Sequence, residues 1–354
     1  MQLLQYIVYP FSLLYGFVML VRNLLFDFRI LPSAKFDRAV ISVGNLSMGG
    51  TGKTPQIEYL IRLLSPACLI ATLSRGYGRN SKGFIIGSEQ SDVKEIGDEP
   101  LQIIRKFKHL KVAVDENRKR GITNLLGKYP GLDVVLLDDA FQHRYVKPGL
   151  SILLTSYAKL YSEDHVMPSG TLREFRDGAD RADIIVVTKT PKIFSPISRR
   201  RILEDLSPRN NQQVFFSYIT YGDPIPLLEP VSGELPARLV SILLLTGIAD
   251  HSLLKEHIQR ICSDVILMRF RDHHSFTATD IAQIESRFND IPTQRKVIIT
   301  TEKDTMRLNT AEISPLISHL PIYYFPIRVE FHGKDKELFD DQVLSFVNRY
   351  KTSL

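Results

Sequence analysis

The stretch from Val43 to Pro55, VGNLSMGGTGKTP, constrains the fold most, because it places a glycine-rich turn between an apolar strand and a helix. The glycines let backbone N–H groups turn toward a phosphate, and a helix that begins at Lys53 adds the positive end of its dipole. Lys53 can reach the β- and γ-phosphates of a nucleotide, and Thr54 offers a hydroxyl to phosphate-bound Mg²⁺. The segment predicts a nucleotide-binding loop formed by Ser47, Met48, Gly49, Gly50, Thr51, Gly52, Lys53 and Thr54.

One position in this loop departs from the usual pattern. Ser47 stands where G-x-x-x-x-G-K-[ST] has its first glycine. If the backbone there needs a positive φ, the loop must begin differently in this chain. The alternative interpretation is a glycine-rich turn that only caps a helix.

From Ala39 to about Tyr218, short apolar segments alternate with helical patterns. The predicted strands are rich in Val, Ile and Leu and lack period-2 alternation, which is typical of parallel strands buried on both faces. They are Ala39–Val43, Leu69–Leu73, Val112–Val114, Val134–Leu137, Ile152–Thr155 and Ile184–Val187, and the helices between them include Thr54–Leu64, Pro100–Lys106 and Asn117–Leu126. This order predicts an α/β fold, a P-loop NTPase-like doubly wound and mostly parallel sheet, with ligands at the carboxyl ends of the strands.

A second, smaller α/β domain is predicted after a linker from Tyr221 to Pro236. Its strands are expected near Val240–Leu245, Val265–Phe270, Lys296–Thr300 and Ile322–Phe325, with helices near Ser252–Ile261 and Thr277–Phe288. We therefore expect an N-terminal helix over residues 1–30, a P-loop core over 31–220 and the smaller domain over 221–354.

The N-terminus is apolar. The run from Tyr6 to Val21 is shorter than the roughly 20 residues that cross a bilayer. A secretory signal would need basic residues ahead of the apolar run, but no Lys or Arg precedes Arg22. Its continuation places a set of apolar residues on one helical face: Phe17, Leu20, Val21, Leu24, Leu25 and Phe28. We expect a helix that lies in the membrane interface, and the alternative is a helix packed on the protein's own core.

Charge and cysteine content narrow the partners. The net charge of +6 favours an anionic partner, whether nucleic acid, membrane surface or acidic substrate, but there is no Trp and no basic run interleaved with aromatics, so no nucleic-acid partner is predicted. Two cysteines, Cys68 and Cys262, lie far apart inside apolar runs, which excludes a disulfide framework and fits a reducing cytoplasm. No obligate protein partner is predicted.

Acidic residues follow two of the predicted core elements. Asp138 and Asp139 end an apolar strand, as the acid of a Walker-B strand does, and are predicted to hold Mg²⁺. Asp98 and Glu99 precede Pro100, where an N-cap with a first-turn acid explains them equally well. In the second domain, Asp272, His273 and His274 could supply a base or a capping turn, and a metal site is the least favoured interpretation because no third ligand stands at ordinary spacing.

Taken together and in this order, the motifs resemble the tetraacyldisaccharide 4'-kinase family, the lipid A 4'-kinases of Gram-negative inner membranes. The resemblance covers nearly the whole chain and rests on these segments: Pro10–Gly16, Ser42–Pro55, Ser74–Arg79, Gly97–Pro100, Leu137–Arg144, Pro168–Glu174, Asp272–His274 and Thr301–Asp304. Ala140, Phe175 and Arg271 depart from the family pattern, which puts fine substrate geometry in doubt but not the reaction.

The resemblance implies transfer of the ATP γ-phosphoryl group to the 4'-hydroxyl of a tetraacyl glucosamine disaccharide 1-phosphate, giving lipid IVA at the cytoplasmic face of the inner membrane by a peripheral or monotopic enzyme. It implies Asp98 as base, His273 as the group that orients it, and Lys53 in catalysis. Thr54, Asp138, Asp139 and Glu99 would hold Mg²⁺. The substrate-binding candidates are Asn45, Tyr77, Arg79, Arg118, Gln142, His143, Arg173 and Glu174.

Two other functions remain as alternatives from the residues themselves. One is a membrane-docked P-loop hydrolase that acts as a switch, although Pro191 stands where the guanine-binding Asp of a T-K-x-D loop would be. The other is a soluble small-molecule kinase, which would leave the apolar N-terminus unexplained.

Overall fold

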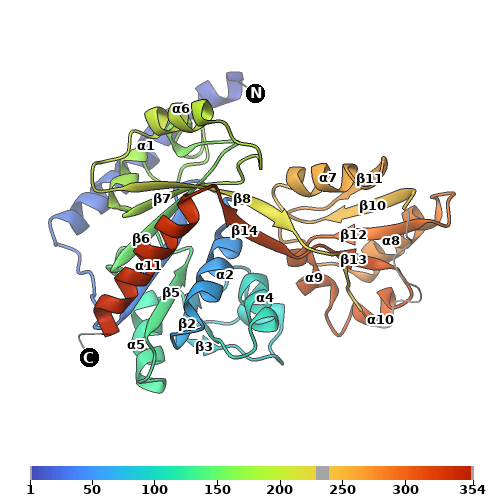
Figure 1. The fold of residues 1–354 in the computed structure, drawn as a ribbon, viewed down its shortest axis with the longest axis horizontal. Coiled ribbons are helices and arrows are strands. Elements are labelled where there is room, and N and C mark those ends of the chain that lie inside the picture. The colour runs from blue at the N-terminus through green and yellow to red at the C-terminus, as the bar shows by residue number, and fades with distance from the viewer. Residues whose placement is uncertain (1, 229–238, 352–354) are drawn as a thin grey trace.

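Two β-sheets of unequal size form the molecule, in a computed structural model that describes residues 2–228 and 239–351 (Figure 1). The nine-stranded sheet has the order β14-β8-β7-β6-β1-β5-β2-β4-β3, and the five-stranded sheet has the order β11-β10-β12-β13-β9. The strands are β1 (Ala39–Asn45), β2 (Ile70–Ser74), β3 (Ile85–Ile86), β4 (Lys111–Val114), β5 (Val134–Asp138), β6 (Leu150–Ser156), β7 (Ile184–Thr188), β8 (Gln213–Tyr221), β9 (Ile225–Pro226), β10 (Ser241–Thr246), β11 (Asp264–Arg269), β12 (Lys296–Thr300), β13 (Ile322–Tyr324) and β14 (Ile327–Phe331).

Helices cover both faces of the large sheet, as the sequence predicted. The α-helices are α1 (Gln2–Asp27), α2 (Lys53–Leu64), α3 (Val93–Ile96), α4 (Asp98–Lys106), α5 (Arg118–Lys128), α6 (Pro196–Leu206), α7 (Ser252–Gln259), α8 (Ala278–Asn289), α9 (Glu302–Leu308), α10 (Ser314–Ile317) and α11 (Asp335–Lys351). Two 3₁₀ turns, η1 (Tyr161–Glu163) and η2 (Arg176–Arg181), complete the described elements.

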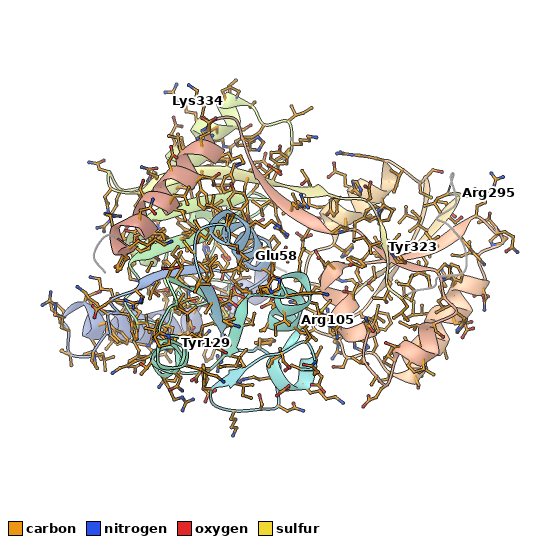
Figure 2. The ribbon with its side chains drawn as sticks, turned by 60° about the horizontal axis from the view of Figure 1, so that its bottom comes forward. Glu58, Arg105, Tyr129, Arg295, Tyr323 and Lys334 are labelled. Carbon is orange, nitrogen blue, oxygen red and sulfur yellow. The ribbon has the colours of Figure 1, made fainter. Side chains whose placement is uncertain are left out.

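Alternate residues of the central strands enter different cores. Ile41 and Leu136 pack in one cluster with α2, α4 and α11, whereas Val40 and Val135 pack on the other face with α5. Because both faces are covered, the strands need apolar residues at every position, which explains the missing alternation in their sequence. Figure 2 shows side chains filling each lobe, with Glu58 inside the large one and Tyr323 in the small one.

The predicted extent of the smaller domain, residues 221–354, needs a correction at its C-terminal end. The chain leaves the large sheet along β8, builds the small sheet, and then returns along β14, which pairs antiparallel with β8. Phe339, Val343 and Phe346 of α11 then pack into the core of the large sheet. Residues 327–351 therefore lie with the large domain, and the sequence analysis missed this because a returning strand has no local signal. Part of the predicted linker, residues 229–236, lies outside the described residues.

Helix α1 lies against the large domain by one face only. Phe26 and Ser12 are buried, but Phe11, Leu14, Phe17, Val18 and Phe28 are each more than half exposed. Most of the predicted apolar face is therefore open rather than packed on the protein's own core, with Phe17 at 59% and Phe28 at 74% exposure. Among the described residues one helical stretch, Val8–Asp27, is long and apolar enough to cross a membrane by length and composition.

Candidate functional site

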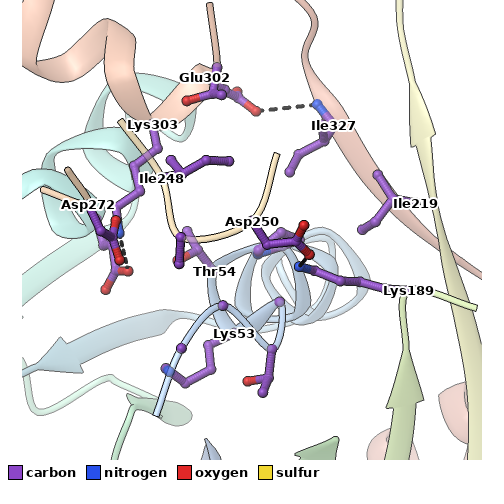
Figure 3. Close-up of a pocket in the computed structure, with 18 of the residues that line it drawn as sticks. Lys53, Thr54, Lys189, Ile219, Ile248, Asp250, Asp272, Glu302, Lys303 and Ile327 are labelled. Carbon is purple, nitrogen blue, oxygen red and sulfur yellow. Dashed lines mark hydrogen bonds and ion pairs between the residues drawn. The ribbon is translucent and has the colours of Figure 1, made fainter. Parts of the chain in front are cut away.

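A cavity of about 340 Å³ lies between the carboxyl edge of the large sheet and the small domain. Figure 3 shows Lys53 on one side of this space and Lys303 and Glu302 on the other. The predicted nucleotide-binding residues that line it are Met48, Gly49, Gly50, Thr51, Gly52, Lys53 and Thr54. Ser47 instead forms an isolated antiparallel bridge with Leu172.

The glycine-rich loop has the backbone form that phosphate binding requires. Gly52, which precedes the first residue of α2, has φ 84°, a conformation that favours glycine. Ser47 is not among the described residues with positive φ, so its side chain causes no conflict at the start of the loop. The Thr188 hydroxyl donates a buried hydrogen bond of 2.8 Å to the carbonyl of Thr51 and fixes the loop on β7.

Lys53 points along the edge of the large sheet. Its Nζ lies 3.4 Å from Asn45 Oδ1 and 3.7 Å from Asp139 Oδ1, and its side chain is 12% exposed. The lysine, the last residue of β1 and the residue after β5 thus meet at the mouth of the loop. This arrangement places the largely buried Lys53 ammonium group where the outer phosphates of a nucleotide would lie.

The two adjacent aspartates after β5 differ in their surroundings. Arg173 donates to both oxygens of Asp139 at 2.9 and 3.2 Å, and although burial acts to raise the pKa of Asp139, Lys53 and Arg173 outweigh it and hold this pKa below its usual range. Asp138 is fully buried, and its Oδ1 has no hydrogen-bond partner among the described residues. Burial and the nearby charges of Glu99 and Asp139 raise the pKa of Asp138 well above its usual range.

A polar network joins α1 to this edge of the sheet. The Gln142 amide donates to Asn45 O at 2.8 Å, and Asn23 of α1 donates to Glu174 Oε2 at 2.6 Å. Glu174 is buried and also accepts from Arg181 at 2.7 Å. Of the substrate-binding candidates, the cavity lining includes Tyr77 and Arg173. Gln142 accepts from Arg173 at 3.2 Å and donates to Glu174 at 3.3 Å.

Three other substrate-binding candidates are engaged within the large domain. Arg118 is 3% exposed, donates to Asp115 O at 3.0 Å, and burial lowers its pKa to about 10. Burial and the charge of Arg118 lower the pKa of His143 to about 4, so this imidazole is neutral. Arg79 donates to Glu116 at 2.6 Å. The structure does not bring these three side chains into the cavity lining.

Asp98 and His273, predicted in different domains, meet across the cavity. His273 Nδ1 lies 3.0 Å from Asp98 Oδ2, and Lys303 Nζ lies 3.3 Å from His273 Nε2. A lysine can only donate, so we assign the neutral tautomer in which Nε2 accepts from Lys303 and Nδ1–H donates to Asp98. Burial acts to raise the pKa of Asp98, but the His273 hydrogen bond and the Lys303 charge outweigh it and lower this pKa.

Local backbone geometry sets up this pair. Gly97 has φ 94°, and a Cβ there would meet the carbonyl of Tyr77 at 2.9 Å, so only glycine fits beside the Tyr77 loop at the start of α4. His273 has φ 57°, which is unfavourable for a non-glycine residue and is a form of strain that occurs at functional sites. The rings of Tyr77 and His273 lie 4.8 Å apart and close one side of the cavity.

The small domain contributes charges that the sequence analysis left without a role. Lys303 donates to Glu99 Oε1 at 3.0 Å, and the charges of Glu99 and Asp98 raise the pKa of Lys303 despite its burial. Lys189, at the end of β7, pairs with Asp250 at 2.8 Å across the cavity (Figure 3). Lys189 was visible as the Lys of a T-K-x-D-like segment, but no sequence pattern indicated its partner in the other domain.

An apolar wall completes the cavity, and it was not predicted from the sequence. It is built from β8, β14, the segment between β13 and β14, and α7 with the segment before it, and its side chains are Ile219, Tyr221, Ile248, Leu254, Phe325 and Ile327. Flat apolar surface beside a phosphate-binding loop suits a planar heterocycle. In residues 2–228 and 239–351, the cavity included, no group of three or more His, Cys, Asp or Glu side chains is arranged to hold a metal ion.

The sequence model of the family described as tetraacyldisaccharide-1-P 4'-kinase matches residues 4–348. The chain belongs to this family. It is 46% identical over 347 residues to a tetraacyldisaccharide 4'-kinase of Flavobacterium johnsoniae, with 98% of each chain covered. It is 43% identical over 355 residues to that of Bacteroides thetaiotaomicron, with 96% of this chain and 92% of the relative covered.

A solved structure supports the fold. The chain resembles the "apo" form of LpxK from Aquifex aeolicus in complex with ATP, with a TM-score of 0.72, 28% identity, and coverage of 97% of this chain and 99% of that one. Family membership makes this protein an ATP-dependent 4'-kinase of lipid A biosynthesis, as the resemblance in the sequence implied. The switch alternative is not favoured.

Proposed function

We propose that Asp98 and His273 act as one unit that removes the proton of the acceptor 4'-hydroxyl while the Val43–Pro55 loop holds the ATP phosphates. The observation that carries this assignment is the 3.0 Å contact between the two side chains beside a cavity lined by Lys53. A sugar hydroxyl is a poor nucleophile at neutral pH, so a base that takes its proton lowers the barrier.

Phosphoryl transfer from ATP to the 4'-hydroxyl forms one P–O bond and breaks another. The hydroxyl oxygen forms a bond to the γ-phosphorus, the bridging P–O bond breaks, and the electron pair leaves with ADP. The proton goes to Asp98, which is ionised at neutral pH because its pKa is low. His273 holds Asp98 through Nδ1, while its Nε2 is occupied by Lys303. Lys53 offsets the charge that builds on the outer phosphates.

The acid cluster fits a Mg²⁺ ion. The partnerless Oδ1 of Asp138 is a buried oxygen ligand without a cation, and Mg²⁺ needs only one or two carboxylates because phosphates and waters fill its other positions. Asp138, Asp139, Glu99 and the Thr54 hydroxyl would hold the ion. When bound, Mg²⁺ neutralises charge on the bridging phosphates.

The test of the dyad is a double-mutant cycle. Asp98→Asn and His273→Ala should each lower kcat by roughly 10²- to 10⁴-fold with ATP affinity retained, and the double variant should lose little more than the worse single variant. Losses that multiply in the double variant would mean that the two residues act separately.

We propose in addition that α1 lies on the cytoplasmic face of the inner membrane, where the lipid A disaccharide precursor is presented. The exposed apolar side chains of α1 support this placement, and its opposite face holds Arg173 through a hydrogen bond from Tyr15 to the Arg173 carbonyl at 3.0 Å. A helix of this kind binds a bilayer in proportion to the apolar area that it buries.

Leu24→Glu combined with Phe28→Glu should weaken binding to liposomes. Turnover of vesicle-borne substrate should then fall about tenfold or more, while turnover of detergent-dispersed substrate changes little, because two exposed apolar side chains that would enter the bilayer are exchanged for charges. Sedimentation with liposomes and the two kinetic assays measure this difference. Equal losses in both assays would contradict an interfacial helix.

A further inference from the structure

Three charged side chains meet beside the cavity, at the junction of the two domains. Lys106, the last residue of α4, lies 2.7 Å from Glu58 Oε2 of α2 and 2.5 Å from Glu302 Oε1 of α9. The Glu58 side chain is 1% exposed and the Glu302 side chain 9%. One lysine therefore joins a buried carboxylate of the large domain to a buried carboxylate of the small domain.

The surrounding groups satisfy both carboxylates. Gln102 donates to Glu58 Oε1 at 2.9 Å, and Arg62 donates to Glu58 Oε2 at 3.0 Å. The backbone N–H of Ile327, at the start of β14, donates to Glu302 Oε2 at 3.3 Å. Figure 2 shows Glu58 inside the large lobe and Arg105, the neighbour of Lys106, at the side that faces the small lobe.

Each of the three helices also carries a residue of the proposed site. Helix α2 begins with Lys53, helix α4 begins with Asp98, and Lys303 follows Glu302 in the first turn of α9. Lys106 thus links α2, α4 and α9, the three helices that position the phosphate-binding loop, the base and the small-domain cation. A helix is stiff over so short a length, so a contact along it fixes the position of its first residue.

Removing the cation would leave an unfavourable arrangement. Burial, and then the charge of Glu58, raise the pKa of Glu302, so this carboxylate depends on Lys106 to remain charged. Breaking a buried ion pair leaves an uncompensated charge, and two facing carboxylates repel each other. The repulsion would act across the domain junction and push α9 away from α2.

We propose that Lys106 is a positioning residue, which holds the small domain at the distance where Lys303 and His273 reach Asp98 beside the phosphate-binding loop. The proposal rests on the site assigned above to Asp98, His273 and Lys53. Lys106 is not among the residues that line the cavity and, in this assignment, touches no reacting atom; its ammonium group contacts the lining through Glu302.

The test uses Lys106→Met, which keeps the length of the side chain and removes its charge. A displacement of about 1 Å at a reacting centre can cost about 10²-fold in rate, so we expect kcat to fall by roughly 10- to 100-fold. The interdomain distance is measured by pulsed electron paramagnetic resonance between spin labels at the exposed positions Lys119→Cys and Arg287→Cys, with Cys68 and Cys262 replaced by Ala. We expect a longer or broader distance distribution in the variant.

The matched control is Lys94→Met. Lys94 and Glu312 also form a Lys–Glu pair between the domains, at 3.3 Å, but their side chains are 67% and 79% exposed. An exposed pair contributes little, so this variant should keep the wild-type kcat and distance. A loss as large as that of Lys106→Met would show that any weakened contact at the junction has the same effect, and would overturn the special role of Lys106.

A second variant separates charge from packing. Glu302→Gln added to Lys106→Met removes the repulsion between the two carboxylates, so the double variant should recover part of the lost kcat and return toward the wild-type distance. Losses that multiply would contradict the proposal. If Lys106→Met does not fold, Lys106→Gln, which removes the charge but keeps a hydrogen-bond donor, is measured in its place, and an unchanged distance distribution would overturn the proposal.

The distance measurement also separates this proposal from the proposed dyad. Asp98→Asn should lower kcat without changing the interdomain distance, because Lys106 remains in place. If Asp98→Asn keeps full activity while Lys106→Met still changes the distance and kcat, the dyad fails and the positioning role stands.

Discussion

The edge of the large sheet and the facing side of the small domain both supply charged groups to the cavity, but they stabilise these groups differently. At the sheet edge, Asp139 is compensated by Arg173 and Lys53, which belong to the same domain. The small-domain charges find their partners on the opposite side: Lys303 pairs with Glu99, and His273 with Asp98. The Asp139 cluster is therefore complete by itself, whereas the small domain contributes Lys303 and His273 only when the two sides meet.

The sheet-edge residues are therefore held within one domain, whereas the cross-domain ion pairs also help to hold the two domains together. Strands such as β1 and β5, buried on both faces, fix the phosphate-binding loop and Asp139 rigidly. The small domain is attached through β8, β14 and a few cross-domain ion pairs, so its position is set by fewer contacts. Variants at the sheet edge should thus affect chemistry alone, while variants of the cross-domain lysines Lys106 and Lys303 should also affect geometry.

The largest expected effect comes from the sheet edge. Lys53→Ala should lower kcat by about 10²- to 10³-fold, because loss of one group that stabilises developing charge typically costs that much. Its fold should be retained, since the side chain makes contacts of only 3.4 and 3.7 Å with Asn45 and Asp139. Steady-state kinetics with circular dichroism measure both, and a folded variant with near-normal kcat would contradict the loop assignment.

Lys303→Ala sharpens the same experiment from the other side of the cavity. Lys303 bridges Glu99 and His273, so its loss should both lower kcat and change the interdomain distance. Lys53→Ala should leave that distance unchanged. If both variants left it unchanged, the small domain would be held as rigidly as the sheet edge, and the contrast between the two regions would not stand.

The same contrast explains what the sequence could predict. The phosphate-binding loop, the strand that ends in Asp138 and the start of α4 are contiguous segments with local patterns, and the strands came within two residues of the prediction at most boundaries. The contact between Asp98 and His273 was expected only through the family resemblance. The Lys189–Asp250 and Lys106–Glu302 pairs were not expected at all, because a single charged residue on a helix or loop gives no sign of a distant partner.

The return of β14 and α11 to the large sheet shows a further limit. Residues 327–351 were expected in the small domain because they follow it directly in the chain. The apolar sequence of β14 would suit a place in either sheet, and only its pairing with β8 assigns it to the large one. Sequence periodicity determines which face of an element is buried, but not against which partner.

Asp138 is the exception at the sheet edge, because burial and the neighbouring acids Glu99 and Asp139 outweigh the cations Lys53 and Arg118 and raise its pKa. Its raised pKa means that the folded protein binds a proton there more tightly than the unfolded chain, so stability is present at low pH and is lost as pH rises through the folded pKa. Asp138→Asn should therefore stabilise the metal-free protein at pH 8 by about 1–3 kcal/mol, the usual cost of a buried unsatisfied group, and raise Tm by a few degrees. The same variant should raise the Mg²⁺ concentration needed for turnover.

Asp139→Asn is the matched comparison, because it changes the neighbouring residue, whose pKa is shifted in the opposite direction. The pKa of Asp139 is lowered, so its contribution to stability is present above the usual Asp range and is lost as pH falls. Replacing it should lower Tm at pH 8, because Arg173 loses both hydrogen bonds. Thermal melts of the two variants without metal, at pH 5 and pH 8, measure the difference. If both substitutions lower Tm at pH 8 equally, Asp138 is a structural acid whose charge is already compensated, and the case for Mg²⁺ at this position fails.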